Sequence, residues 1–346
     1  MQSTRSLAWR HVACAACAPL LAGSTLVGPL LAVAGAEDPP RLAAEWGEHG
    51  SGASQLQHPR GIDIDERGVL YFADWRNHRV QMFDRAGNHL GSWGSEGSAP
   101  GQFSEPLGVA VGTEGHVYVT DRNNYRVQKF QSDGTFVTEW GSEGYADGQF
   151  LLVHAIAIDA DGDVYVTDAG RGIVQRFTSA GEFVLAFGAS GLGQLIAPLG
   201  ITIDSSGNVF VTDLAQAAEA VVKFTRSGEY LLRWGGFGEI PGYFQTPIGI
   251  DTDSRGDVYV VDHHNFRVQK FTNDGAFISE WGTQGRDGVQ FVGPHDMVVD
   301  DQDDLFIIDL GNDGVVQHYT YRPVSVESVS WSEVKRLYHL PAAVQR

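Results

Sequence analysis

One pattern of apolar and polar positions recurs along most of the chain, and its clearest copy is Ser104–Phe150. Two alternating runs, GVAV and HVYVT, are separated by a turn sequence, and Asp121 closes the second run. The runs RVQKF and FVTEW follow after polar loops and end at Gly141. Alternation with a period of two residues, bounded by Gly, Asp and Asn, is typical of strands joined by tight turns. The unit therefore predicts four short antiparallel strands.

Two series of residues mark the copies of this unit along the chain. An aromatic residue followed by Gly closes each copy at intervals of 47 residues: Trp46, Trp93, Trp140, Phe187, Trp234 and Trp281. An Asp that ends an apolar run forms the second series: Asp74, Asp121, Asp168, Asp213, Asp262 and Asp309. Four strands in a repeat of this length make one propeller blade. A helical solenoid would need apolar residues three and four positions apart, and the copies lack that spacing.

The two ends of the repeat region predict how the ring closes. Five complete units begin at His58, Ser104, Leu151, Ile196 and Gln245. A sixth unit begins at Val292 but supplies three strands, ending near Tyr319, while the missing strand precedes the first unit as Leu42–Gly47. A ring closed by the N-terminal strand leaves no free sheet edge at that point. We therefore expect an all-β, six-bladed propeller of four-stranded antiparallel blades over residues 37–320.

Residues 1–36 have the composition of a targeting segment. Arg5 and Arg10 precede an apolar run over Val12–Val33, and Ala34-Gly35-Ala36 fits the small-residue cleavage pattern. We expect a cleaved signal peptide and hence an exported protein, periplasmic or secreted; the alternative is an uncleaved membrane anchor. Both cysteines of the chain lie in this segment, so the mature chain would be held together without disulfides.

The chain is strongly acidic, with 24 Lys and Arg against 43 Asp and Glu. Removal of residues 1–36 would bring the net charge to about −21. Such a charge, without any basic run, disfavours nucleic acid and anionic membranes as partners, and no spanning segment follows residue 36. We expect a monomer. The tail, residues 321–346, leaves the repeat, and Ser330–Leu340 predicts a short helix that either straps the rim or binds a partner.

The unit resembles the NHL repeat through the pattern P-x-G-[IV]-x-[VI]-D-x-x-G-x-[VL]-Y-V-x-D-x-x-N-x-R-[VI]-Q-x-F. It is clearest in three units, which contain Asp74/Asn77/Arg79, Asp121/Asn124/Arg126 and Asp262/Asn265/Arg267. The resemblance implies a propeller over roughly residues 42–320, but NHL propellers serve as enzymes, RNA binders and protein-interaction platforms. Function must therefore come from the site. The regularity of these triplets indicates a structural role, in which the Asp braces a loop and pairs with the Arg.

Candidate functional residues are those at which the repeat pattern fails. The residue before the usual Gly of the innermost strand rings the channel mouth, at Arg60, Leu107, His154, Leu199, Ile248 and His295. Two of these residues are His. The Gly that usually follows is replaced by Ala155 after His154 and by Asp296 after His295. These exceptions fall in the third and sixth blades, which lie opposite each other in a ring of six.

Imidazole and carboxylate side chains at the same channel mouth predict a metal site. His154, His295 and Asp296 are the candidate ligands, with His264 as an additional one, and zinc or another divalent transition metal suits them. The alternative is that these side chains merely hydrate the channel. Arg60, Arg122, Arg171 and His263 share this face and suit an anionic ligand, unless nearby acids neutralise them.

GPHDMVVD (Gly293–Asp300) resembles the zinc-binding Pro-His-Asp segment of peptidyl-hydroxyglycine amidating lyases. That resemblance implies zinc binding by His295 and calcium binding by Asp296, and His154 resembles a second His segment of the family. The chain departs from that family in spacing, because its two His lie three blades apart where the lyases use every second blade.

Together these features predict an exported propeller that acts as a binding module. A protein, peptide or glycan would bind across its channel-mouth face. The alternative function is a metal-dependent lyase or hydrolase with its metal at the mouth.

Overall fold

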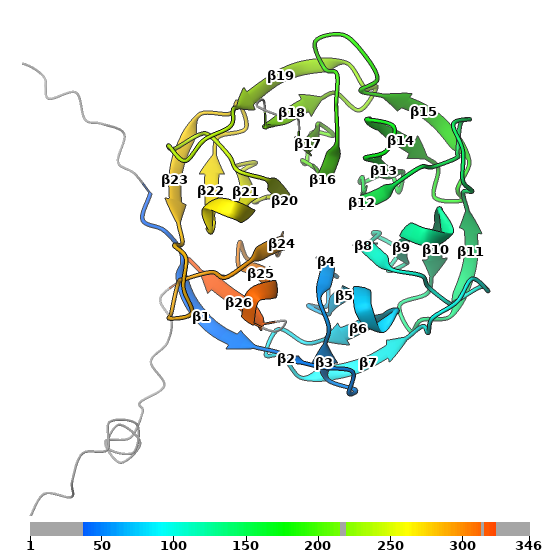
Figure 1. Ribbon diagram of the computed structural model, residues 1–346, viewed down its shortest axis with the longest axis horizontal. Coiled ribbons are helices and arrows are strands. Elements are labelled where there is room, and N and C mark those ends of the chain that lie inside the picture. Colours follow the sequence, from blue (N-terminus) through cyan, green and yellow to red (C-terminus); the bar gives the residue numbers. More distant parts are fainter. Residues whose placement is uncertain (1–36, 215–218, 313–314, 323–346) are drawn as a thin grey trace, which may run out of the picture. The chain divides into compact units, whose positions relative to one another are not determined.

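The computed structural model describes residues 37–214, 219–312 and 315–322. The predicted signal peptide and nearly all of the predicted tail with its helix lie outside these residues. The described residues form six four-stranded antiparallel sheets arranged around a central channel (Figure 1). The predicted all-β six-bladed propeller is therefore confirmed.

Each blade runs from an inner strand at the channel to an outer strand at the rim. Blade 1 comprises β4 (Pro59–Ile64), β5 (Leu70–Asp74), β6 (Arg79–Phe83) and β7 (His89–Trp93); blade 2 comprises β8 (Pro106–Val111), β9 (Val117–Asp121), β10 (Arg126–Phe130) and β11 (Phe136–Trp140); blade 3 comprises β12 (Val153–Ile158), β13 (Val164–Asp168), β14 (Ile173–Phe177) and β15 (Phe183–Phe187). Blade 4 comprises β16 (Pro198–Ile203), β17 (Val209–Asp213), β18 (Ala220–Phe224) and β19 (Tyr230–Gly235); blade 5 comprises β20 (Pro247–Thr252), β21 (Val258–Asp262), β22 (Arg267–Phe271) and β23 (Phe277–Trp281).

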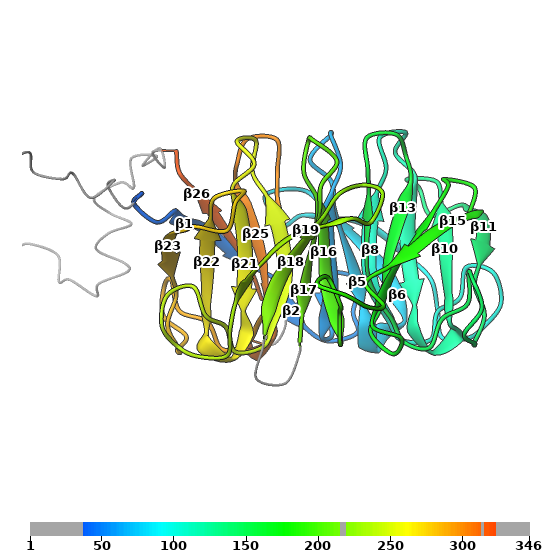
Figure 2. The same cartoon turned by 90° about the horizontal axis from the view of Figure 1, so that it is seen from above.

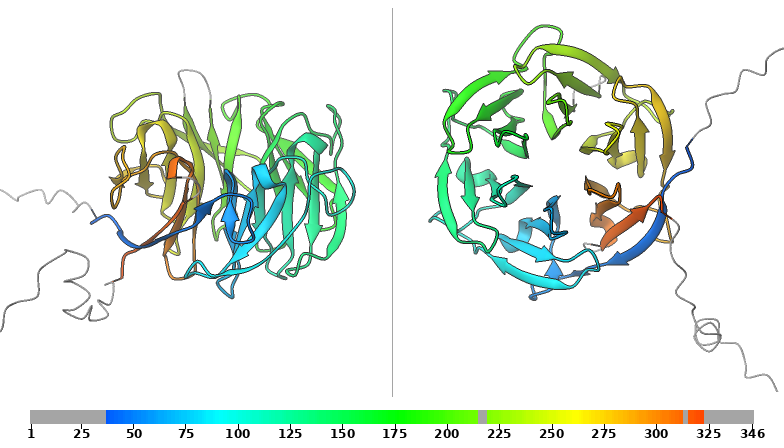
Figure 3. Two further views of the ribbon diagram at one scale, coloured as in Figure 1. Left: turned by 60° about the horizontal axis from the view of Figure 1, so that its bottom comes forward. Right: turned by 180° about the vertical axis from the view of Figure 1, so that it is seen from behind.

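The sixth blade combines the two ends of the propeller. It contains β24 (Pro294–Val299), β25 (Leu305–Asp309) and β26 (Val315–Thr320), and β1 (Arg41–Trp46) is its outer strand. β1 pairs antiparallel with β26, so that Trp46 lies opposite Val316 and Arg41 opposite Thr320. Figure 3 shows this closure from behind, with the first strand lying along the last. The pairing removes the exposed edge that β26 would otherwise present.

The two faces of the ring are built from different connections (Figure 2). Because the strands of a blade alternate in direction, one face carries the loop between β-strands two and three of each blade and the loop that leads to the next blade. We call this the mouth face. It includes the 3-10 turns η1 (Trp75–Asn77), η2 (Arg122–Asn124), η3 (His263–Asn265) and η4 (Leu310–Asn312), and the short parallel pair β2 (Glu48–His49) and β3 (Gln55–Leu56). The far face carries the hairpin turns.

Aromatic side chains fill the space between neighbouring blades. The ring of Trp93, at the end of blade 1, lies 5.6 Å from the ring of Phe130 in blade 2, and Trp140 lies 5.8 Å from Phe177 in blade 3. Phe130 and Phe177 are fully buried. The Trp-Gly series therefore forms the apolar seams of the ring.

The repeated Asp braces the mouth-face loops, as the sequence predicts. In blade 2 the Asp121 carboxylate accepts hydrogen bonds from the Ser104 amide at 2.7 Å and from Asn124 at 2.8 Å. It also pairs with Arg126 at 2.8 Å, and that guanidinium donates to carbonyl oxygens of the preceding interblade loop, including that of Gln102 at 2.7 Å. Asp74 and Asp262 make the same three kinds of contact in blades 1 and 5, so in these three blades the Asp ties a turn, a strand and an interblade loop together.

The inner strands are fastened to one another by two alternative devices. In blades 2, 3 and 4 a Thr hydroxyl on the second strand accepts from its own inner strand and donates to a carbonyl of the next blade, as Thr120 does to His154 at 2.7 Å. The corresponding donors are Thr167 to Leu199 at 3.0 Å and Thr212 to Ile248 at 2.8 Å. The other three blades have Ala73, Val261 and Ile308 at that position.

In those three blades an aspartate on the inner strand makes the link instead. Asp63 accepts from the Val111 amide at 2.7 Å, Asp251 from Val299 at 2.7 Å and Asp296 from Ile62 at 3.1 Å. Each carboxylate thus bonds to the inner strand of the next blade around the ring. Three seams are held by Thr and three by Asp.

Candidate functional site

The channel mouth brings together four of the candidate site residues. Arg60, His154, His295 and Asp296 line a small cavity of about 20 Å³, with Leu107 and Ile248. Leu107, Ile248 and the residues equivalent to them are each the second residue of an inner strand, which explains why one sequence position in each repeat supplies the ring. A cavity of this volume accommodates about one water-sized group.

Main-chain carbonyls orient two of the mouth imidazoles. The Nδ1 atom of His295 lies 3.1 Å from the carbonyl oxygen of Arg60, and Nδ1 of His263 lies 2.7 Å from that of Pro294. A carbonyl accepts, so both rings carry their proton on Nδ1 and expose Nε2 as an acceptor. The two ring centroids are 6.2 Å apart.

The mouth imidazoles are held in the neutral form. Burial, together with the Arg60 guanidinium, lowers the pKa of His154 to about 4. Burial and the charge of Arg60 lower the pKa of His295 well below its ordinary value, and burial likewise lowers the pKa of His263. The charge of Arg60 contributes to the lowered pKa of all three rings.

The other two predicted metal ligands differ in position, because Asp296 lines the same cavity and His264 lies outside it. His264 is exposed, and its Nδ1 contacts the hydroxyl of Thr246 at 2.7 Å. Asp296 lies one residue deeper in the channel and bonds to the Ile62 amide. Among the described residues, no group of three or more His, Cys, Asp or Glu side chains is arranged to hold a metal ion. The zinc and calcium assignments remain predictions.

Two of the predicted ligand-binding arginines have protein partners. Arg122 forms an ion pair with Glu105 at 3.2 Å. Arg171 donates to the carbonyl oxygens of Ala146 and Gln149 at 3.2 and 2.9 Å. Arg126 contacts the equivalent loop carbonyls in blade 2, so Arg171 replaces the pattern arginine that blade 3 lacks. The sequence reading missed this substitution because the two arginines occupy different positions of the repeat.

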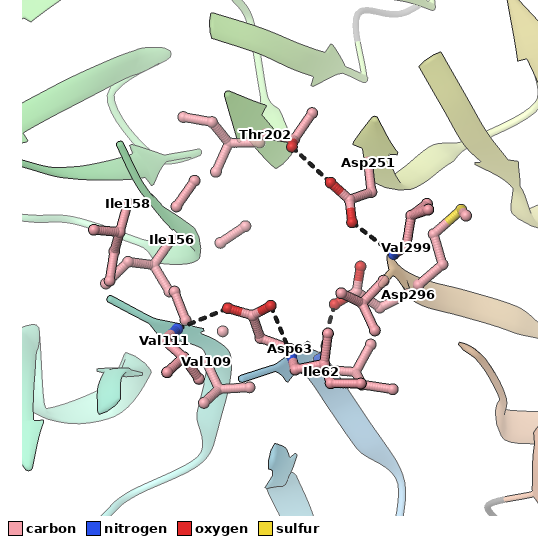
Figure 4. A pocket seen from close by; sticks show the side chains of 18 of the residues that line it. Ile62, Asp63, Val109, Val111, Ile156, Ile158, Thr202, Asp251, Asp296 and Val299 are labelled. Atoms are coloured by element: carbon pink, nitrogen blue, oxygen red, sulfur yellow. Dashed lines mark hydrogen bonds between the residues drawn. The ribbon is translucent and has the colours of Figure 1, made fainter. Parts of the chain in front are cut away.

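A second and larger cavity occupies the channel below the mouth and opens toward the far face. Its volume is about 340 Å³, and Figure 4 shows isoleucine and valine side chains around it, with the carboxylates of Asp63, Asp251 and Asp296. Burial raises the pKa of Asp296 to about 8, of Asp63 to about 7 and of Asp251 to about 6. Sequence reasoning missed Asp63 and Asp251, although an Asp within an apolar inner strand was a visible signal.

The mouth face also carries exposed apolar side chains on its interblade loops. Among the described residues thirteen large apolar side chains are exposed, and six of these lie on outer strands. The remaining seven lie on loops that lead into blades 3 to 6: Tyr145, Leu192, Ile196, Phe237, Ile240, Tyr243 and Val289. Sequence reasoning missed this group because loops that look polar overall, such as SEGYADGQF, each contribute only one or a few such residues.

Comparison with known proteins identifies the repeat. Residues 103–130 and 244–271 match the family model of the NHL repeat, and these segments are the clearest copies in blades 2 and 5. The chain therefore carries NHL repeats on a six-bladed propeller. Over 45 residues it is 47% identical to Protein lin-41 of Caenorhabditis elegans, a match that covers 13% of this chain and 4% of that protein.

Solved structures that are similar to this chain share its fold. A streptogramin B lyase structure superposes with a TM-score of 0.58 at 17% identity, covering 81% of this chain and 88% of that one. A gluconolactonase from Xanthomonas campestris gives a TM-score of 0.59 at 16% identity, covering 82% of this chain and 95% of that one. At these identities the similarity concerns the fold alone. In the described part of the chain, no helix is long and apolar enough to cross a membrane.

Proposed function

We propose that this chain is an interaction module that holds a protein or peptide partner across its mouth face. The observation that carries the proposal is the set of exposed apolar side chains on the interblade loops of that face. Leu192 is 83% exposed, Ile240 is 62% exposed and Phe237 is 56% exposed. Apolar groups gathered on one face of a soluble fold are typical of a binding surface.

The scaffold beneath these loops is suited to binding. Buried Asp residues brace the loops, and Thr or Asp side chains fasten each pair of blades. Loops held in this way lose little conformational freedom when a partner binds, which favours affinity. The NHL repeats add support, because NHL propellers commonly mediate protein interactions.

The composition of residues 1–36 supports an extracytoplasmic site of action. We include export in the proposal for that reason, and the strong net negative charge of the chain, −19, is consistent with a soluble interaction module.

Selection from a random peptide library displayed with free C-termini tests the proposal. The full chain serves as bait, and selected peptides are then measured against two double variants. Phe237→Ser with Ile240→Ser removes apolar groups from the mouth face, whereas Leu90→Ser with Val184→Ser removes them from outer strands. The mouth-face variant should lose binding by about tenfold or more, because each buried apolar side chain contributes roughly 1.5–3 kcal/mol. Equal loss in both variants, or failure to select any peptide, would refute the proposal.

A second candidate, a metal-dependent lyase or hydrolase, is supported by one observation. His263 and His295 each donate Nδ1–H to a main-chain carbonyl, which is how proteins commonly orient metal-binding imidazoles. Elemental analysis of the purified chain, repeated on His154→Ala and His295→Ala variants, tests it. Stoichiometric zinc, iron or calcium that both substitutions remove would support this candidate, and the lack of any such metal would eliminate it.

A further inference from the structure

Blade 1 carries an arginine at the mouth, Arg60, that is stacked on a tryptophan. The Arg60 guanidinium lies over the ring of Trp75, with its central carbon 4.6 Å from the ring centroid. Arg76 lies over the same ring at 3.9 Å. Among the described residues, no carboxylate lies within ion-pairing distance of either guanidinium. The Trp75 ring therefore holds two like charges close together at the edge of the channel.

The surroundings of Arg60 are themselves positive. Burial, and then the charges of Arg76 and Arg122, lower the pKa of Arg60, while Glu105 opposes this effect. Glu105 is itself paired with Arg122. A half-buried cation beside two others is unfavourable unless an anion joins it. The arrangement is therefore prepared for an anionic ligand.

The same charges disfavour a cation at this position. Arg60 acts on His154, His263 and His295 together, so a metal ion among these rings would sit next to a guanidinium. A planar guanidinium instead suits a carboxylate, to which it can donate two parallel hydrogen bonds. The adjoining cavity, of about 20 Å³, has room for about one water-sized group and excludes a bulky side chain.

The position of this arginine relative to the apolar loops indicates what carries the anion. Blade 1 lies opposite blade 4 in the ring (Figure 1), and the loops that flank blade 4 carry Leu192, Ile196, Phe237 and Ile240. A ligand anchored at Arg60 and extending across the mouth would meet these apolar groups. An extended peptide that ends in a carboxylate has this shape and chemistry.

We propose that Arg60, with Trp75 and Arg76, forms a binding site for the C-terminal carboxylate of a peptide whose apolar side chains reach the loops around blade 4. This inference rests on the proposed function, because it names the class of partner for the same face and the direction in which that partner's chain runs. A nucleic acid is a poorer fit, since it would require a row of cations along its phosphates. Arg60 and Arg76, the described arginines that contact Trp75, instead form one compact cluster.

Titration calorimetry of the full chain with N-acetyl-Ala-Leu-Phe tests the inference, in parallel with the C-terminal amide of the same tripeptide. The free acid should bind at least about tenfold more tightly than the amide, because a hydrogen-bonded charge pair is lost on amidation. Arg60→Gln should weaken binding of the free acid by a similar factor and leave the affinity for the amide unchanged. Arg60→Lys should give an intermediate loss, since it keeps the charge and loses the planar fork.

Arg286→Gln is the matched control. Arg286 is an exposed arginine on a mouth-face loop away from Trp75, and its substitution changes the net charge equally. It should leave binding of the acid within about twofold. The fold of Arg60→Gln should persist, because His295 bonds to the main-chain carbonyl of residue 60 rather than to its side chain.

Equal affinities for acid and amide, or an unchanged affinity in Arg60→Gln, would overturn the carboxylate site. Library peptides that still depended on Phe237 and Ile240 would in that case leave the proposed function standing. No detectable binding of the acid at millimolar concentration would also overturn the inference. Tighter binding of a single-stranded RNA than of the acid, lost in Arg60→Gln, would assign the arginines to phosphate and contradict the proposal.

Discussion

Single residues in the channel decide how the protein responds to pH. Asp63, Asp251 and Asp296 each link two blades, and burial raises the pKa of all three. A carboxyl whose pKa is raised on folding stabilises the folded state at low pH, and this contribution is lost as the pH rises through the folded-state pKa. His154 and His295 act oppositely, because their lowered pKa destabilises the fold below the ordinary pKa of histidine.

The two effects separate above pH 6.5, where histidine is neutral in both states. Between pH 6.5 and 8.5 we expect the free energy of unfolding to fall by roughly 2 kcal/mol, because Asp296 and Asp63 keep in the folded state a proton that the unfolded chain has already released. Urea unfolding at a series of pH values measures this slope. Asp296→Asn should remove most of it, since the pKa of Asp296, about 8, is the highest of the three. A flat or rising stability over this range would show that these carboxyls are already ionised.

The residue scale also shows where sequence reasoning reached its limit. The exceptions at His154 and His295 could be found from the repeat, because each occupies a defined position. The partnership of Arg60 with Trp75 could not, since Trp75 lies on a turn and meets Arg60 only through the path of the chain. The role of Arg171 was hidden for the same reason, as its contacts are carbonyl oxygens, which any sequence supplies.

At the scale of elements, the inner strands approach one another closely at glycine. A Cβ atom placed at Gly200 would lie 2.0 Å from the carbonyl oxygen of Ile248 in the next blade, and one at Gly61 would lie 2.4 Å from that of Leu107. Both of the contacted atoms belong to the backbone, so they cannot rotate away as a side chain could. The Gly of the repeat therefore reflects the spacing between blades as well as turn formation.

Gly200→Ala should consequently destabilise the protein by about 1–3 kcal/mol, the usual cost of overpacking a rigid site. Ala155→Gly is the reverse change at the equivalent position of blade 3, and it should cost about 1 kcal/mol or less. Thermal unfolding of both variants provides the comparison. If Gly200→Ala were as stable as the native chain, the blades would have to be able to move apart.

The elements themselves were well predicted from the sequence. Turn residues and alternation placed the strands of Ser104–Phe150 correctly: β8, β10 and β11 contain the predicted runs, and β9 contains all of its run except His116. The devices that fasten the blades were not predicted. They depend on which side chains face across a seam, and Thr120 and Asp63 perform this task from different strands.

At the scale of the whole molecule, ring closure joins the two ends of the propeller. Removal of residues 1–47 would leave β26 as an exposed edge and take Trp46 from the cluster that includes Phe72 and Phe83. We expect this truncation to lower the melting temperature and cause aggregation, since an unpaired edge can pair with other chains. Truncation of residues 1–36, which keeps β1, is the control and should melt like the full chain. Matching behaviour of the two truncations would show that closure by β1 is dispensable.

The central claim is that partners bind on the mouth face, and hydrogen–deuterium exchange of the full chain with a selected peptide tests it most directly. We predict slower exchange in the interblade loops at residues 142–150, 188–197 and 236–246. The far-face hairpin turns at residues 65–69, 112–116 and 159–163 should exchange as in the free chain. Protection of these far-face turns, with unchanged exchange in the interblade loops, would contradict the account.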